Sequence, residues 1–363
     1  MSSISRLQVE TAIKEYTDPY TDQDLVASKA IKDIRIDGDK VSVDVVLGYP
    51  AKGFHAKLKA ALKERIEAIK GVGGVEIGIH SKIEPHAVQK GVKRVPGVKN
   101  IIAVASGKGG VGKSTTAVNL ALALAAEGAT VGILDADIYG PSQPRMLGIH
   151  DRPDSKDGRT LEPLVNHGVQ SISIGYLIDE ETPMIWRGPM VTQALEQLLN
   201  DTNWKDVDYL VVDLPPGTGD IQLTLAQKVP VTGAVIVTTP QDIALLDARK
   251  GLKMFEKVDV PVLGIVENMS IHICSNCGHE EYIFGAGGGE RMSTDYGVDL
   301  LGALPLDIGI REQVDSGNPS VVSDPDGRIA EIYREIARRV AAKVAALSKD
   351  YSGKFPNIVI QNT

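Results

Sequence analysis

Hydrophobic residues in positions 1–85 follow two short periods. Val41, Val43 and Val45 alternate with polar residues behind an Asp-Gly-Asp turn, which predicts a β-hairpin. Further along, apolar residues recur three and four positions apart, which predicts a helix. The predicted elements are helices over 7–16, 25–31 and 56–69, a hairpin of 34–36 with 41–47, and a strand over 75–79. Together they indicate a small α/β domain over residues 1–85.

From residue 101 onward the pattern changes to continuous apolar runs separated by helical segments. Such runs indicate strands that are buried on both faces, as in a parallel sheet covered by helices. The predicted strands are IIAVAS (101–106), TVGILDAD (130–137), YLVVDLPP (209–216), GAVIVTTP (233–240) and VPVLGIVENM (260–269). The fold class we expect is α/β, with a mostly parallel sheet covered by helices on both faces, beside the small N-terminal domain.

The segment 84–97 separates the two patterns. It holds two prolines and two glycines and has no strong hydrophobic period, which is typical of a linker. We place the linker at 86–97, the larger domain at 98–350 and an uninformative tail at 351–363. The last periodic segment, 328–347, carries apolar residues three or four positions apart. This stripe favours packing against the core over the alternative of an amphipathic helix on a membrane.

Composition and charge exclude several classes of function. No apolar run approaches the roughly 18 residues of a membrane span, and the N-terminus lacks the order of a secretory signal. Residues 1–97 carry 16 basic against 13 acidic residues, and the remainder carries 23 against 34. Nucleic-acid binding rests on a dense basic surface, so we expect no nucleic acid partner. The expected location is cytoplasmic, without a membrane partner.

The sequence GKGGVGKST at 107–115 lies between a predicted strand and a predicted helix, and it matches the phosphate-binding pattern G-x-x-x-x-G-K-[ST]. Glycines let backbone N–H groups curve around phosphate oxygens, and the helix N-terminus adds a positive dipole. Lys113 is expected to reach the β- and γ-phosphates of ATP, and the Ser114 hydroxyl to ligate Mg²⁺. A glycine-rich loop without a ligand is the alternative. The predicted nucleotide-binding residues here are Gly107, Lys108, Gly109, Gly110, Val111, Gly112, Lys113, Ser114 and Thr115.

Three aspartates end predicted strands at the sheet edge where α/β proteins bind ligands. Asp135 and Asp137 end the strand TVGILDAD, and Asp213 ends YLVVD. Asp213 matches the position of a Walker B aspartate, which holds Mg²⁺ directly or through water. The glycines of the following LPPGTGD (214–220) can move with the γ-phosphate. Any one of these aspartates is alternatively a helix N-cap.

Both cysteines of the chain, Cys274 and Cys277, lie in one C-x-x-C motif that a glycine follows. Two thiolates at this spacing form half of a tetrahedral metal or cluster site. Because one chain supplies only two cysteines, a Cys₄ site needs a second copy. His279 or His272 can instead complete a zinc site within one chain. A redox-active dithiol and an incidental pair are the remaining alternatives.

Six motifs in order resemble the Mrp/ApbC family of bacterial iron–sulfur cluster carrier ATPases. They are GKGGVGKST, LDADIYGPS, MIWRGPM (184–190), DLPPGTGD, ENMS followed by C-x-x-C, and LGALPLDIGIRE (301–312). The resemblance covers roughly residues 97–345. The glycine-rich loop, with Lys108 after its first glycine, is similar to the deviant Walker A of the wider family that contains MinD, ParA and the nitrogenase iron protein.

This resemblance implies a homodimer that bridges a [4Fe–4S] cluster between the two C-x-x-C motifs, hydrolyses ATP slowly and delivers clusters to apoproteins. The implied catalytic residues are Lys108, which acts in trans in an ATP sandwich dimer, Lys113, and Asp137, which positions the attacking water. Asn268 is implied to read the adenine edge. The implied partners are apo iron–sulfur proteins as recipients and a cluster assembly scaffold as donor.

The N-terminal domain resembles the small domain of cytosolic iron–sulfur targeting factors, with two departures. Asp18-Pro19-Tyr20 stands where Asp-Pro-Glu is expected, and residues 1–97 contain no cysteine. We interpret this domain as a docking or regulatory module. The competing class for the whole chain is a positioning or segregation ATPase of the MinD/ParA kind, in which the cysteines hold zinc.

Overall fold

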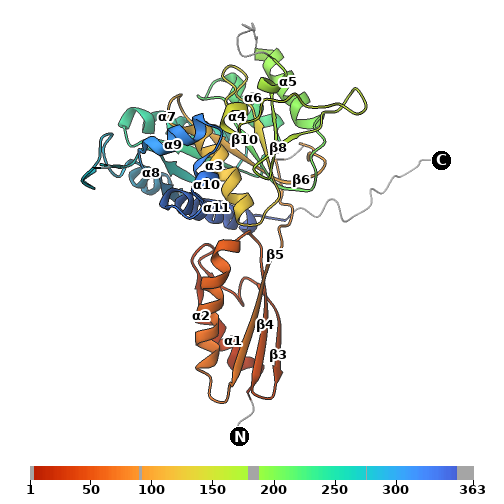
Figure 1. The fold of residues 1–363 in the computed structure, drawn as a ribbon, viewed down its shortest axis with the longest axis vertical. Coiled ribbons are helices and arrows are strands. Elements are labelled where there is room, and N and C mark those ends of the chain that lie inside the picture. The colour runs from red at the N-terminus through yellow and green to blue at the C-terminus, as the bar shows by residue number, and fades with distance from the viewer. Residues whose placement is uncertain (1–3, 90–91, 179–187, 275, 350–363) are drawn as a thin grey trace, which may run out of the picture.

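The structure of the chain is a computed structural model that describes residues 4–89, 92–178, 188–274 and 276–349. Its smaller part is a three-stranded sheet of order β3-β4-β5 with two helices packed on it (Figure 1). The elements are α1 (Arg6–Lys14), β1 (Thr17–Asp18), β2 (Gln23–Asp24), β3 (Ile31–Asp37), β4 (Lys40–Leu47), η1 (Lys52–Phe54), α2 (His55–Glu67) and β5 (Gly74–Ser81).

The expected hairpin is confirmed, because β3 and β4 pair antiparallel across a turn at Gly38, whose φ is 62°. A left-handed φ of this kind costs glycine little. β4 then pairs in parallel with β5, and α2 forms the crossover between them. The result is a small sheet with one face covered by helices.

The prediction of a helix over residues 25–31 is wrong, because the chain forms turns there. The Asp24 carboxylate accepts a hydrogen bond from the Val26 amide at 2.9 Å and so closes a local turn. Lys29 has a φ of 58°, which a right-handed helix does not contain. Ile31 then begins β3.

The larger part is built on an eight-stranded sheet of order β15-β12-β11-β6-β10-β7-β9-β8, in which β8 alone runs antiparallel to its neighbour. The strands are β6 (Val98–Ala105), β7 (Val131–Asp135), β8 (Leu164–Asn166), β9 (Val169–Ser173), β10 (Val207–Asp213), β11 (Gly233–Thr238), β12 (Val262–Glu267) and β15 (Leu300–Ala303). Every residue of β7, β10 and β11 is buried, as their continuous apolar sequences predict.

Helices cover both faces of this sheet. The chain steps from β6 toward β7 in one direction along the sheet and from β11 toward β12 in the other. Because such crossovers are right-handed, α3 and α7 pack on opposite faces. The elements are α3 (Lys113–Ala126), α4 (Gln143–Met146), η2 (Ile174–Tyr176), α5 (Gly188–Asn200), α6 (Asp220–Lys228), α7 (Asp242–Lys257), α8 (Gly288–Tyr296), α9 (Ile308–Asp315), α10 (Ser320–Ser323) and α11 (Arg328–Ala346). The reversal at β6 is the point where open α/β sheets bind ligands.

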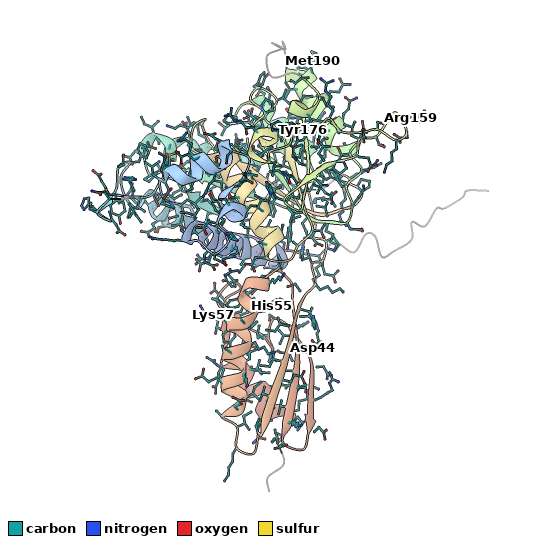
Figure 2. All side chains as sticks on the ribbon, in the orientation of Figure 1. Asp44, His55, Lys57, Arg159, Tyr176 and Met190 are labelled. Carbon is teal, nitrogen blue, oxygen red and sulfur yellow. The ribbon has the colours of Figure 1, made fainter. Side chains whose placement is uncertain are left out.

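The smaller part contacts the larger part at Glu127, the residue that follows α3. The Glu127 carboxylate accepts a hydrogen bond from the Gly53 amide at 2.8 Å, and its carbonyl accepts one from the Lys52 amide at 3.1 Å. A Cβ on Gly53 would lie 2.8 Å from the Glu127 carboxylate, so a larger residue would have to displace this side chain. His55, at the start of α2, lies on the side of the smaller part that faces α11 (Figure 2).

Arg338 of α11 completes this contact. Its side chain is 4% exposed and lies 3.0 Å from the Glu127 carboxylate and 2.8 Å from that of Glu331. The guanidinium also donates to the Tyr20 hydroxyl at 2.6 Å and lies over the Tyr20 ring. The apolar stripe of α11 is buried, which confirms that this helix packs on the core, while Arg338 joins it to the N-terminal residues.

We expect Arg338→Met to lower the free energy of unfolding by about 3–5 kcal/mol, because it leaves the buried Glu127 carboxylate without a cation. Arg334→Met on the same helix is the matched control. Its side chain is 20% exposed, and among the described residues it pairs only with the half-exposed Glu331, so about 1 kcal/mol or less is expected. Urea denaturation compares the two variants, and equal losses would contradict the importance of the buried contact.

Candidate functional site

The glycine-rich loop runs from the end of β6 to the start of α3. Gly110 and Gly112 have φ values of 83° and 82°, which turn their peptide groups as a phosphate-binding loop requires. A Cβ on Gly107 would lie 2.1 Å from the Asp247 main chain in α7, so the loop is pressed against that helix. The loop is therefore shaped by close contacts that only glycine permits.

Lys113, the first residue of α3, lies beneath the loop with its side chain 6% exposed. Its ammonium forms an ion pair with Asp213, lies 3.9 Å from Asp137 and donates to the Ser114 hydroxyl at 3.1 Å. The structure thus brings together four residues that the sequence placed on three separate motifs. Lys113 supplies the one cation of this group.

Asp135 and Asp213 are paired in register at the ends of neighbouring strands, and both side chains are fully buried. Burial and the Asp213 carboxylate raise the pKa of Asp135 to about 7, against the effect of hydrogen bonds from backbone amides. The Asp135 carboxylate accepts from the amides of Asp137, Ser142 and Gln143 and from a serine hydroxyl. Asp135 therefore anchors the segment between β7 and α4.

Asp137 lies in that segment, with its side chain 15% exposed. The pKa of Asp137 is raised overall, chiefly by burial. The Lys113 ammonium lowers this pKa and the Asp213 carboxylate raises it. The oxygens of Ser114, Asp137 and Asp213 are the hard donors that Mg²⁺ prefers, so this group of residues fits the ion.

Asn268, which follows β12, is 8% exposed and contacts the same loop. Its side-chain amide donates to the Val111 carbonyl at 2.9 Å. This contact was not anticipated from the sequence. Lys108 is half-buried, and none of the ion pairs between described residues includes its ammonium. The roles of Lys108 in trans and of Asn268 toward adenine remain predictions.

One residue of the site was missed altogether. Gln143, at the start of α4, is fully buried and donates from its side-chain amide to Asp213 at 2.9 Å and to the Ser114 carbonyl at 3.2 Å. It stands in the sequence directly after GPS, where no spacing rule marks a glutamine.

The segment 214–220 joins β10 to α6. The Gly217 amide donates to the Ser106 carbonyl at 2.9 Å, with a φ of 102° at this glycine. Gln222 of α6 donates back to the Pro216 carbonyl at 2.6 Å. The segment thus lies against the end of β6, beside the glycine-rich loop. Of the motif MIWRGPM, residues 184–187 lie outside the described residues, as does the tail 351–363.

The C-x-x-C motif lies in a short hairpin of β13 (His272–Ile273) and β14 (Glu280–Glu281). The Cys274 amide donates to the His279 carbonyl, and the Gly278 amide donates back to the Cys274 carbonyl at 2.8 Å. Gly278 has a φ of 72°, which closes the turn. Hydrogen bonds from the Asn276 and Cys277 amides lower the pKa of the Cys274 thiol. Such amides stabilise a thiolate at the hairpin tip.

The surroundings of the cysteines bear on which metal site they form. Cys277 is exposed and Cys274 is half-buried. Within the described part of the chain, no group of three or more histidine, cysteine, aspartate or glutamate side chains gathers at a metal-binding spacing. The His272 ring is instead bonded to the Leu306 carbonyl at 3.1 Å. A pair of thiols with no third ligand gathered beside it among the described residues matches half of a shared site.

The fold and the glycine-rich loop define a P-loop NTPase, and a family model identifies the family of P-loop NTPases to which the chain belongs. The model of the NUBPL iron-transfer P-loop NTPases matches residues 97–341, so the chain belongs to this family. A second model, of iron–sulfur cluster assembly proteins, matches residues 6–77. The resemblance to cluster carrier ATPases is thereby confirmed. No helix among the described residues is both long and apolar enough to cross a membrane.

Curated relatives match more than two thirds of the chain. It is 53% identical over 343 residues to the iron–sulfur cluster carrier protein of Escherichia coli (strain K12), covering 93% of this chain and 92% of that protein. It is 61% identical over 278 residues to the carrier protein of Pseudomonas fragi, covering 76% and 97%. The iron–sulfur cluster transfer protein NUBPL of Mus musculus is 51% identical over 254 residues, covering 69% and 80%.

Solved structures confirm the fold. A nucleotide-binding protein from Archaeoglobus fulgidus in complex with ADP matches with a TM-score of 0.57 and 36% identity, covering 65% of this chain and 93% of that one. The cell division ATPase MinD of Pyrococcus furiosus matches with a TM-score of 0.51 and 23% identity, covering 66% and 98%, and shares the fold alone.

We expect Lys113→Met to lower the free energy of unfolding by about 3–5 kcal/mol near pH 8, because it leaves two buried carboxylates without a cation. The loss should be smaller near pH 5.5. The pKa of Asp135 is raised to about 7, so at pH 5.5 this carboxyl is protonated and needs no cation. The stability that goes with a raised carboxyl pKa is present at low pH and is lost as the pH rises through that pKa. Urea denaturation at both pH values measures the difference.

Lys108→Met is the matched control, since it removes the same charge from the same loop without leaving a buried carboxylate unpaired. A change of about 0.5 kcal/mol or less is expected at either pH. An identical loss in Lys113→Met at both pH values would contradict the electrostatic account of the site.

Proposed function

We propose that this protein binds iron–sulfur clusters and transfers them to apoproteins, with ATP binding and slow hydrolysis controlling a homodimer. One observation carries the proposal: the only two cysteines of a P-loop NTPase in the iron-transfer family lie at an exposed hairpin tip, and among the described residues no third ligand gathers with them. The carrier and transfer names of relatives at 51–61% identity support it.

The cargo is a [4Fe–4S] cluster held by Cys274 and Cys277 of each of two copies. A cluster of this type takes four thiolates, and a two-fold axis supplies them from two identical pairs. The exposure of Cys277 supports this arrangement, because a bridging thiolate must reach the partner subunit. The recipients are apo iron–sulfur proteins, and a cluster assembly scaffold is the donor. The protein works in the cytoplasm, with no nucleic acid or membrane partner.

The ATPase site uses residues of both copies. Lys113 binds the β- and γ-phosphates, Ser114 and Asp213 hold Mg²⁺, and Asp137 orients the attacking water. The Lys113 ammonium pairs with Asp213 here, and it would leave this carboxylate to contact phosphate, so that Asp213 would be free to hold Mg²⁺. Mg²⁺ supplies charge stabilisation of the transferring phosphoryl group. Lys108 extends to the nucleotide of the partner, and Asn268 reads the adenine edge.

The two sites are joined by a short segment of chain. Asn268 bonds the glycine-rich loop through the Val111 carbonyl, and Cys274 follows only six positions later. Between them, the Ser270 amide bonds the Leu304 carbonyl and the Leu306 amide bonds the Ile271 carbonyl. These hydrogen bonds would transmit a shift of the glycine-rich loop on nucleotide binding to the cysteine hairpin. This path supports control of cluster binding by ATP.

We expect Cys274→Ala and Cys277→Ala each to lose nearly all iron after anaerobic reconstitution. Each single change removes two of four thiolates per dimer, and two cannot hold the cluster. The wild-type protein should hold about two irons per chain, the count for one four-iron cluster per dimer. His279→Ala should change the iron content little. Full iron in either cysteine variant would contradict the bridged cluster.

Mixing Lys108→Ala with Asp137→Ala chains should restore part of the ATP hydrolysis that each variant lacks alone. If Lys108 acts across the interface, a heterodimer contains one site with both groups intact. Steady-state phosphate release from mixtures that are proven by mass spectrometry to exchange subunits measures the effect. Activity that never exceeds the sum of the two separate variants would contradict action in trans.

A further inference from the structure

Gln143 occupies an unusual place for a polar side chain. It is fully buried at the start of α4, and its main-chain amide donates to the Asp135 carboxylate at 3.1 Å. Its side-chain nitrogen donates to Asp213 and to the Ser114 carbonyl. Gln143 therefore bonds Asp135 and the two residues, Ser114 and Asp213, that are proposed to hold Mg²⁺.

The orientation of the Gln143 amide follows from its partners. A carboxylate oxygen and a main-chain carbonyl both accept hydrogen bonds, so the nitrogen of the amide must face them. The amide oxygen, Oε1, is then the end of the group that faces neither of these two acceptors. The two ends of one small group thus have opposite hydrogen-bonding character at a defined place.

Oε1 is buried and has no hydrogen-bond partner among the described residues. A buried acceptor without a partner costs about 1–3 kcal/mol, so native proteins keep few of them. A leucine or methionine of similar size would avoid this cost. The retained acceptor points to a donor that is present when the site is in use.

We propose that Gln143 is a positioning residue for the Mg²⁺ that accompanies the nucleotide. Its nitrogen holds one oxygen of Asp213 and leaves the other for the cation, while Oε1 accepts a hydrogen bond from a water of the Mg²⁺ shell. Mg²⁺ keeps several waters when bound by one or two protein ligands, so such donors are available. This inference rests on the proposed nucleotide site and goes beyond it by assigning a residue that none of its motifs contains.

The amide also links the cation to the segment that carries Asp137. Through its main chain, Gln143 bonds Asp135, which also binds the Asp137 and Ser142 amides. A cation that orders the Gln143 side chain therefore orders this segment. A purely structural glutamine would stabilise the fold without regard to Mg²⁺.

The test compares ADP binding by calorimetry with Mg²⁺ and with EDTA in the wild-type protein and in Gln143→Met. Mg²⁺ should strengthen ADP binding to the wild type, and this gain should fall by about tenfold in the variant, the loss of about one hydrogen bond to a charged shell. ADP affinity in EDTA should stay within about twofold, because the amide does not touch the nucleotide in this account. Gln143→Asn, which is too short to reach Asp213, should behave in the same way and serves if the methionine variant does not fold.

Gln170→Met is the matched control. Gln170 of β9 is a buried glutamine whose amide is bonded at both ends to the Lys205 main chain. Its replacement should lower the melting temperature and leave the Mg²⁺ gain unchanged. A wild-type Mg²⁺ gain in both Gln143 variants, or equal losses with Mg²⁺ and with EDTA, would overturn the inference. Absence of any Mg²⁺-dependent ADP binding in the wild type would instead overturn the proposed nucleotide site.

Discussion

Two carboxylates, Asp135 and Asp213, lie fully buried side by side at the ends of neighbouring parallel strands, and Lys113 is the cation that makes this arrangement tolerable. Two buried anions in contact are unfavourable unless donors and a positive charge surround them. The start of α3, the segment before α4 and the side chain of Gln143 supply these groups. The same electrostatic demand fits the proposal that Mg²⁺ and phosphate bind at this group of residues.

Helix α3 and strand β12 connect the nucleotide site to the N-terminal part and to the cysteine hairpin. α3 begins at Lys113 and ends beside Glu127, where the N-terminal residues and Arg338 are bonded. β12 ends at Glu267, and the chain then passes through Asn268 at the glycine-rich loop to the cysteine hairpin. The N-terminal part and the cysteines are thus each one element away from the nucleotide site. This arrangement supports the proposed control of cluster binding by nucleotide.

Local features of the sequence predicted the parts of the molecule that depend on local rules. The glycine-rich loop, the continuous apolar strands and the strand-end aspartates follow from spacing and composition. The prediction of a helix over residues 25–31 is wrong because Asp24 closes a turn where the apolar spacing suggests a helix. Arg338 lies opposite the apolar stripe of α11, where solvent is expected, and is buried only because the N-terminal part packs there. Gln143 is likewise placed by contacts with residues that are distant in sequence.

The central claim is that two copies of this chain share one cluster between their cysteine pairs. Native mass spectrometry of the anaerobically reconstituted protein tests it most directly, because one spectrum reports both the number of chains and the mass of the bound metal and sulfide. The account predicts a species of two chains with four irons and four sulfides, which follows from the Cys₄ coordination of such clusters. A single chain that carries one zinc ion would contradict it.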